Sequence, residues 1–206
     1  VENRIMEEIY GPERALMEMA LSTQGLHRNM KNMSREETSL HVTLDDKDPD
    51  AAFTSVPYDK GKLFFLYLEQ KFGRDIFDPF MKQYFTEHSF QSISSKLFID
   101  YLKENLLKPH PGIVSLEKIE EWIYGTGMPA DAPHPTSDVF TIVQDQQNDW
   151  LSGKITLKDI PTKDWAVHQW LHFITNLPAD IPVKRLTELD KAFNLTQSRN
   201  NEIAHA

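Results

Sequence analysis

The chain has 206 residues, 40% of them hydrophobic and 11% aromatic, which is enough to bury a real core in one or two domains. Its formal net charge of −9 argues against a nucleic-acid partner, because a phosphate-binding surface needs clustered lysine and arginine. No apolar run approaches the ~18 residues of a membrane span, so we expect no membrane partner. The lack of cysteine excludes disulfides and thiolate chemistry within the chain.

Helical periodicity dominates the chain and predicts an all-α fold. Residues 2–33 predict one or two helices with a break near Gly11 and Pro12, since proline suits a first helical turn. Residues 34–59 are polar and predict a long loop, a kind of segment that is often functional. Residues 63–72 are apolar nearly all round and predict a buried helix that ends at Gly73.

Further helices are predicted on both sides of a glycine- and proline-rich segment. Apolar residues at 76, 77, 80, 81, 84 and 85 form a helical stripe, and the aromatic-rich stretch from Phe64 to Phe85 is most simply core. Serines 94 or 95, and then Ser115, are expected to cap the next two helices. After the segment, helices are expected over 138–151, 162–177 and 182–193, with another beginning near Asn200, in the manner of an α-solenoid.

The most informative motif is SVPYDKG, from Ser55 to Gly61. It ends the polar loop, leads into the apolar helix, and places the hydroxyl of Tyr58 at a helix start. The segment from Asp48 to Gln70 that contains it resembles the stretch after the metal site in zinc aminopeptidases of the leukotriene A4 hydrolase and aminopeptidase N superfamily, the gluzincins. The resemblance extends to residues 2–11, 122–129 and 186–203 in the right order, and so covers nearly the whole chain.

This resemblance implies a domain organisation and an activity. Residues 1–127 would be the helical second half of a thermolysin-like catalytic domain, residues 128–137 a linker, and residues 138–206 the beginning of a HEAT- or armadillo-like helical domain. The parent protein would be a zinc metalloaminopeptidase that hydrolyses the amino-terminal bond of a peptide substrate.

Three residues receive roles through the resemblance. Tyr58 matches the tyrosine that donates a hydrogen bond to the tetrahedral intermediate, although a buried tyrosine with a satisfied hydroxyl is the plain alternative. Asp50 matches an acidic position at the amino-terminal side of the substrate pocket, and a solvated loop carboxylate explains it equally well. Phe53 stands where members with lipid epoxide hydrolase activity have a tyrosine, which favours a plain aminopeptidase.

The family's zinc ligands are missing from this chain. No H-E-x-x-H motif is present, and in the nearest pattern, His168 to His172, Gln169 cannot take a proton from a metal-bound water. Those two histidines are more typical of half-buried side chains than of ligands, so no metal residue is assigned. We therefore expect a C-terminal fragment whose zinc comes from the missing N-terminal half of the same protein. The alternative is a non-catalytic helical binding module on the same scaffold.

Overall fold

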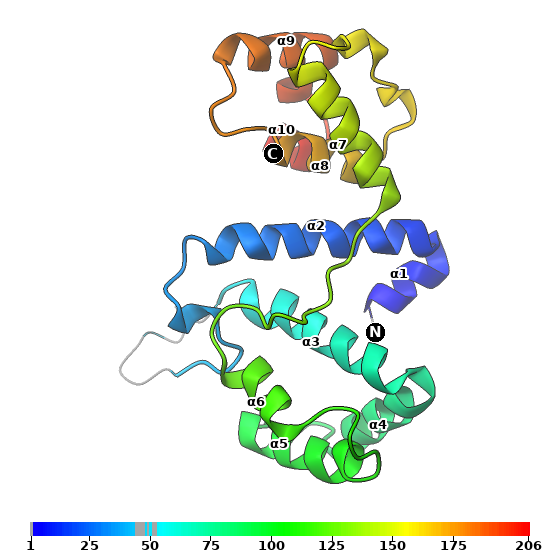
Figure 1. Cartoon of the computed structure of the whole chain (residues 1–206), viewed down its shortest axis with the longest axis vertical. Helices are drawn as coiled ribbons and strands as arrows, with labels where there is room; N and C mark the ends of the chain where they lie inside the picture. Colours follow the sequence, from blue (N-terminus) through cyan, green and yellow to red (C-terminus); the bar gives the residue numbers. More distant parts are fainter. Residues whose placement is uncertain (1, 44–47, 49, 51–52) are drawn as a thin grey trace. The chain divides into compact units, whose positions relative to one another are not determined.

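The computed structural model describes residues 2–43, 48, 50 and 53–206. Over these residues the fold is all-α, with no strand, which confirms the predicted class (Figure 1). None of the described helices combines the length and the apolar composition that crossing a bilayer requires.

Contacts between residues divide the chain into two compact units. Unit 1 consists of Val1–Ser22 with Pro135–Ala206, and unit 2 consists of Thr23–His134. The division after His134 falls within the segment predicted as a linker. The grouping of the first residues with the C-terminal helices was not suggested by the sequence pattern, and the domain boundaries at 127 and 138 stay a prediction.

The first two helices are α1 (Glu2–Tyr10) and α2 (Pro12–Met30). They are separated by Gly11, whose φ of 88° is a left-handed value that favours glycine. Pro12 is the first residue of α2, where its missing N–H costs no helical hydrogen bond. The predicted break between two helices is therefore confirmed.

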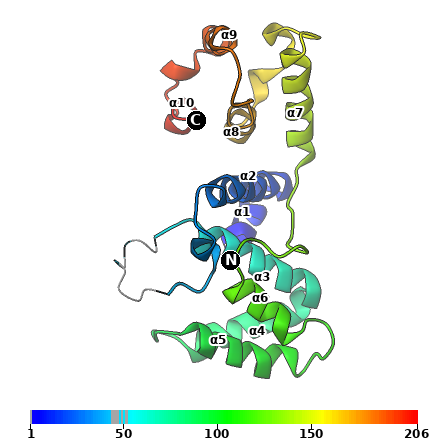
Figure 2. The same cartoon turned by 60° about the vertical axis from the view of Figure 1, so that its left-hand side comes forward.

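Unit 2 is built on α3 (Val56–Phe72). Figures 1 and 2 both show α4, α5 and α6 on the same side of α3. The rings of Phe64 and Tyr67 lie 5.4 and 5.5 Å from that of Trp122 on α6, at the centre of the core. The other helices of the unit are α4 (Arg74–Glu87), α5 (Ser95–Leu102), a π-helical continuation at Lys103–Leu107, and α6 (Leu116–Tyr124).

Several boundaries in unit 2 test the sequence predictions. Ser94 and Ser115 do cap α5 and α6, because their hydroxyls accept from the backbone N–H of Leu97 (3.2 Å) and Lys118 (3.3 Å). Helix α3 begins at Val56 rather than at residue 63, so all of the motif after Ser55 lies within the helix and not before it. The prediction that the aromatic stripe is core throughout is wrong at Phe85, which is 58% exposed.

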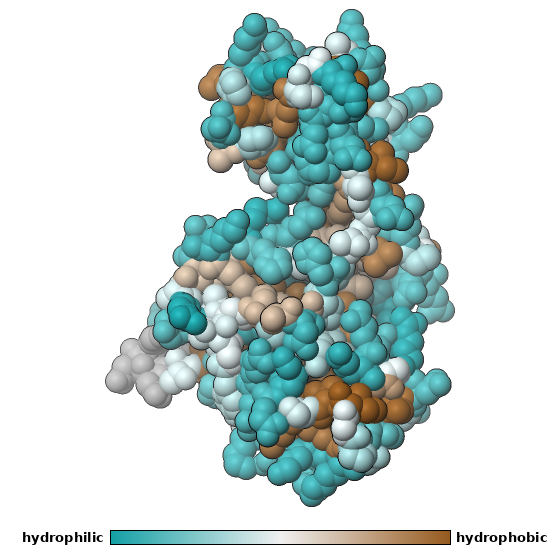
Figure 3. All heavy atoms as spheres, in the orientation of Figure 1, coloured by the Kyte–Doolittle hydropathy of each residue, from teal (hydrophilic) through white to brown (hydrophobic). Residues whose placement is uncertain are grey.

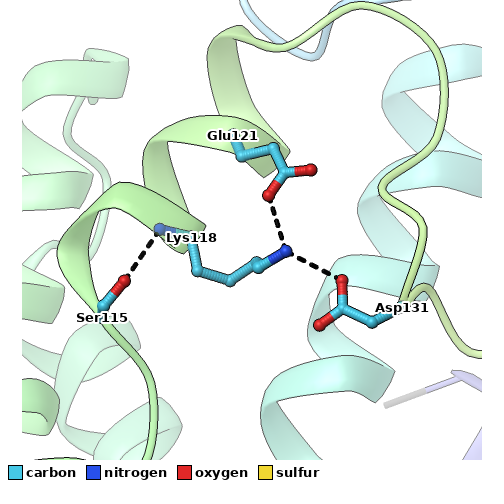
Figure 4. Close-up of polar contacts among 4 residues, drawn as sticks. All are labelled: Ser115, Lys118, Glu121 and Asp131. Carbon is cyan, nitrogen blue, oxygen red and sulfur yellow. Dashed lines mark hydrogen bonds and ion pairs between the residues drawn. The ribbon is translucent and has the colours of Figure 1, made fainter.

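A charge cluster fixes α6 to the segment that follows it. The ammonium group of Lys118 lies 2.6 Å from a Glu121 carboxylate oxygen and 2.9 Å from Asp131 (Figure 4). These hydrogen bonds raise the pKa of Lys118, and the hydrogen bond from Lys118 lowers the pKa of Asp131. The chain after α6 is thereby held close to the helix.

Unit 1 contains α7 (Asp138–Leu151), α8 (Val167–Thr175), α9 (Val183–Phe193) and the short α10 (Asn201–Ala204). Its core includes Trp150 and Phe173, whose rings are 6.0 Å apart across the packed helices α7 and α8. Helix α8 is shorter than predicted, since residues Thr162–Asp164 form a separate 3₁₀ turn.

The surface of unit 2 is mostly polar on the face shown in Figure 3. Apolar residues gather in its lower part, where Figure 1 places α4 and α5. Phe85, Phe90 and Leu97 are large apolar residues of this region that remain exposed.

Candidate active site

Tyr58 lies in the first turn of α3. Pro57 precedes it with a preset φ, the hydroxyl of Thr54 accepts from the N–H of Val56 (3.3 Å), and the N–H of Asp59 donates to the Ser55 carbonyl (2.8 Å). The tyrosine side chain is 71% exposed. Within the described residues its phenol makes no hydrogen bond, so the hydroxyl is open to a ligand. The alternative of a buried tyrosine is wrong.

Asp50 and Phe53 are in the segment just before α3. The N–H of Phe53 donates to the Asp50 carbonyl (3.1 Å), and the N–H of Asp50 donates to the Asp48 carboxylate (3.0 Å). Both side chains are exposed, Phe53 at 79%. Residues 49, 51 and 52 lie outside the described residues. The described part of the chain shows no hydrogen bond or ion pair between Tyr58 and either residue.

An open groove borders the same turn of α3. Its volume is ≈ 270 Å³, and Pro57 and Gly61 line it on the α3 side. Rings of Phe65, Tyr84 and Phe98 form much of the remaining wall, so the groove is largely apolar. Tyr58 follows Pro57 in the same turn but is not itself among the residues that line the groove.

Lys60 is a residue of the site that the sequence interpretation missed. A lysine in this polar run would be expected to face solvent, yet its side chain is 0% exposed. Its ammonium group donates to the backbone carbonyls of Thr38 (2.9 Å) and Gly125 (2.8 Å). Burial lowers the pKa of Lys60 to about 8, so the group still carries its proton at neutral pH.

The signal that reveals Lys60 is its register on the helix. It is four residues after Val56 and three before Leu63, both of which are buried. A lysine at this spacing belongs to the apolar stripe of the helix and not to its solvated face.

The two histidines of α8 contact other side chains of unit 1. Both are buried, not half-buried as predicted. His168 Nε2 lies 2.7 Å from a Glu18 carboxylate oxygen, and the ring of His172 stacks on Phe140 at 4.3 Å with an interplanar angle of 5°. The same pair of His168 and Glu18 borders an open cavity of ≈ 730 Å³ between α2, α8 and α10, on other elements than Tyr58. Nowhere in the described ranges do three His, Asp or Glu side chains come together as a ligand set.

Comparison with known proteins gives consistent matches. The model of the peptidase family M1 domain matches residues 1–122. A leukotriene A-4 hydrolase homolog of Botryotinia fuckeliana is 28% identical over 99% of this chain and 32% of its own length. Leucine aminopeptidase 2 of Coccidioides immitis is 31% identical over 84% of this chain and 29% of its own length.

The fold gives the same result. The solved structure of native leukotriene A4 hydrolase from Saccharomyces cerevisiae matches 98% of this chain with a TM-score of 0.78 and 26% sequence identity, and the match covers 36% of that structure. The all-α architecture thus corresponds to the helical C-terminal part of that fold. The chain spans about a third of the length of the curated relatives it matches.

Proposed function

The chain belongs to peptidase family M1, and from that we propose that it is part of a zinc metalloaminopeptidase that releases amino-terminal residues from peptides. The leucine aminopeptidases among its relatives support the substrate class. The match covers only about a third of the length of these relatives. This supports the proposal that other parts of the same protein complete the active site.

Tyr58 supplies the transition-state hydrogen bond in this proposal. When water attacks the scissile carbonyl, negative charge develops on the former carbonyl oxygen. A neutral phenol that donates to this oxygen stabilises the transition state more than the ground state, and one such donor is worth about 3–4 kcal/mol. The observation that carries the proposal is the exposure of Tyr58, whose hydroxyl has no partner among the described residues and stands at an ordered helix start.

Asp50 and Phe53 are proposed to form part of the pocket wall. A carboxylate at Asp50 attracts the α-ammonium group of a peptide, and its exposure leaves it accessible to a ligand. Phe53 offers an aromatic face without a hydroxyl group. This difference favours peptide hydrolysis without the additional epoxide hydrolase activity.

Zinc is the cofactor that family membership implies, and it would supply Lewis-acid chemistry at the scissile bond. The described residues of this chain do not fit it, since they contain no set of three nitrogen or oxygen ligands. We therefore propose that the metal ligands and the general base lie outside this chain. Metal analysis of the chain alone should find less than one zinc per chain after dialysis against a chelator. One tightly held zinc that His168→Ala removes would point instead to the paired histidines.

The experiment uses the longest protein that contains this chain, with Tyr58→Phe as the variant and Tyr124→Phe as the control. Tyr124 is also exposed, but it ends α6 and has no role in the proposal. Tyr58→Phe should lower kcat on aminoacyl substrates by about 10²–10³-fold, with KM and zinc content nearly unchanged. Tyr124→Phe should leave kcat within about twofold, the level expected when no transition-state contact is lost.

Two outcomes contradict the proposal. An unchanged kcat for Tyr58→Phe removes the catalytic role of this tyrosine. A longer protein that has neither bound zinc nor aminopeptidase activity would contradict the proposal that the chain is part of an enzyme. The chain would then be a helical binding module on the same scaffold.

A further inference from the structure

Lys60 joins three segments that are distant in the chain. Its ammonium group bonds to a carbonyl at the end of the 3₁₀ turn Glu36–Thr38 and to another just after α6. Two more hydrogen bonds connect the segments around these carbonyls. The Gly127 N–H donates to the Thr38 hydroxyl (2.7 Å), and the His41 N–H donates to the Ile123 carbonyl (2.9 Å). We call Thr38, Lys60, Gly125 and Gly127 the Lys60 junction.

The charge of Lys60 suits this position. A buried ammonium group is costly unless its donors are satisfied, and here two backbone carbonyls accept from it. Gly125 follows the last residue of α6, where the helix dipole favours a positive charge. Among the described residues Lys60 is the one lysine, arginine, aspartate or glutamate that is buried. The desolvation cost of a buried charge is therefore paid at this turn.

The turn that gains from this anchor is the one that carries Tyr58. Ser55 precedes the helix but its side chain makes no capping hydrogen bond, and the Thr54 hydroxyl accepts only from the N–H of Val56. Two residues along a helix are rotated by about 200°. Lys60 therefore holds the inner face of the turn while Tyr58 projects from the outer face, as their exposures of 0% and 71% show.

We infer that Lys60 is a positioning residue for the Tyr58 phenol, and this inference rests on the catalytic role proposed for Tyr58. The lysine does not touch the substrate. It fixes the height and rotation of the first turn of α3, so that the phenol meets the oxygen on which charge develops. A displacement of about 1 Å at such a donor can lower the rate by up to 10²-fold.

The test is a double-mutant cycle in the longest protein that contains this chain, with Tyr58→Phe, Lys60→Met and the double variant. Lys60→Met alone should lower kcat by about tenfold or more. In the Tyr58→Phe background it should change kcat by less than about twofold, because the group that it positions is gone. A merely structural lysine would lower kcat by the same factor in both backgrounds.

The matched control is Lys62→Met. Lys62 is in the same turn region but half-buried, at 3.3 Å from the Asp59 carboxylate, and it lies outside the junction. It should leave kcat unchanged in both backgrounds. If Lys60→Met does not fold, Thr38→Val loosens the same junction through the Gly127 contact, and the same dependence on Tyr58 is expected of it.

The outcomes separate the two ideas. Equal losses in both backgrounds, or no loss from Lys60→Met, overturn the positioning role while the role of Tyr58 stands. No loss from Tyr58→Phe overturns the proposed function, and the positioning role with it.

Discussion

Lys60 binds its proton less tightly in the folded chain than in the unfolded one. Its pKa is about 8 in the fold, against a usual value of 10.5. Between these pH values the unfolded state binds more protons, so this group adds stability as the pH rises from about 8 to 10.5 and loses it as the pH falls through 8. The gain is at most about 3 kcal/mol.

Urea unfolding of the wild type and of Lys60→Met at pH 7.5 and at pH 10 measures this gain. The difference in free energy of unfolding, wild type minus variant, should be larger at pH 10. Lysines such as Lys118, whose pKa is raised, titrate alike in both proteins and cancel from the difference. A difference that does not change with pH would show that the folded Lys60 titrates normally.

Tyr58 and Lys60 illustrate what a local motif predicts about single residues. The motif predicts a phenol at a helix start, and the structure has Tyr58 there, exposed. The partners of Lys60 are 22 and 65 residues away in the sequence. A lysine in a polar run is indistinguishable from a solvated one until the fold brings those carbonyls to it.

At the scale of the helices, two glycines predict opposite effects for the same substitution. Gly73, between α3 and α4, has φ 76° and ψ 158°, a conformation reached almost only by glycine. Gly73→Ala should therefore destabilise the fold by about 1–3 kcal/mol. Gly25, inside α2, has ordinary helical geometry and open space around a Cβ, so Gly25→Ala should stabilise by about 0.5–1 kcal/mol.

Thermal unfolding of the two glycine variants, measured beside the wild type, tests these two predictions. The midpoint should fall for Gly73→Ala and rise for Gly25→Ala, which separates backbone conformation from any general effect of the added methyl group. Shifts of the same sign would contradict the argument.

The helices whose residues repeat with a clear period were predicted well. Helix α7 spans Asp138–Leu151, the range that the periodicity predicts, and the serine caps of α5 and α6 follow from side-chain chemistry alone. The start of α3 was missed because its first turns carry charged residues and its inner face is completed by a lysine. The π-helical turn after α5 was not predicted, and its Leu106 and Leu107 are buried in the core.

At the scale of the whole molecule, net charge and exposed apolar surface act in opposite directions. The charge of −9 disfavours association at long range, but salt screens it beyond about 8 Å at physiological ionic strength. Helix α1 buries none of its residues. Ile5 and Ile9 lie one turn apart on the same face and are 50% and 64% exposed, with Tyr10 exposed beside them.

This face of α1 should make the chain self-associate when it is studied alone. Burying an isoleucine side chain is worth about 1.5–3 kcal/mol, and in the longer protein that we propose another segment would cover it. Sedimentation velocity over a concentration series should show oligomers, more of them at higher salt as repulsion weakens. The double variant Ile5→Gln with Ile9→Gln should be monomeric, whereas Ile142→Gln, which changes a single exposed residue on α7, should associate like the wild type. A wild-type chain that stays monomeric at every concentration and salt level would mean that the α1 face needs no cover, and the case for a docking segment would lose its structural support.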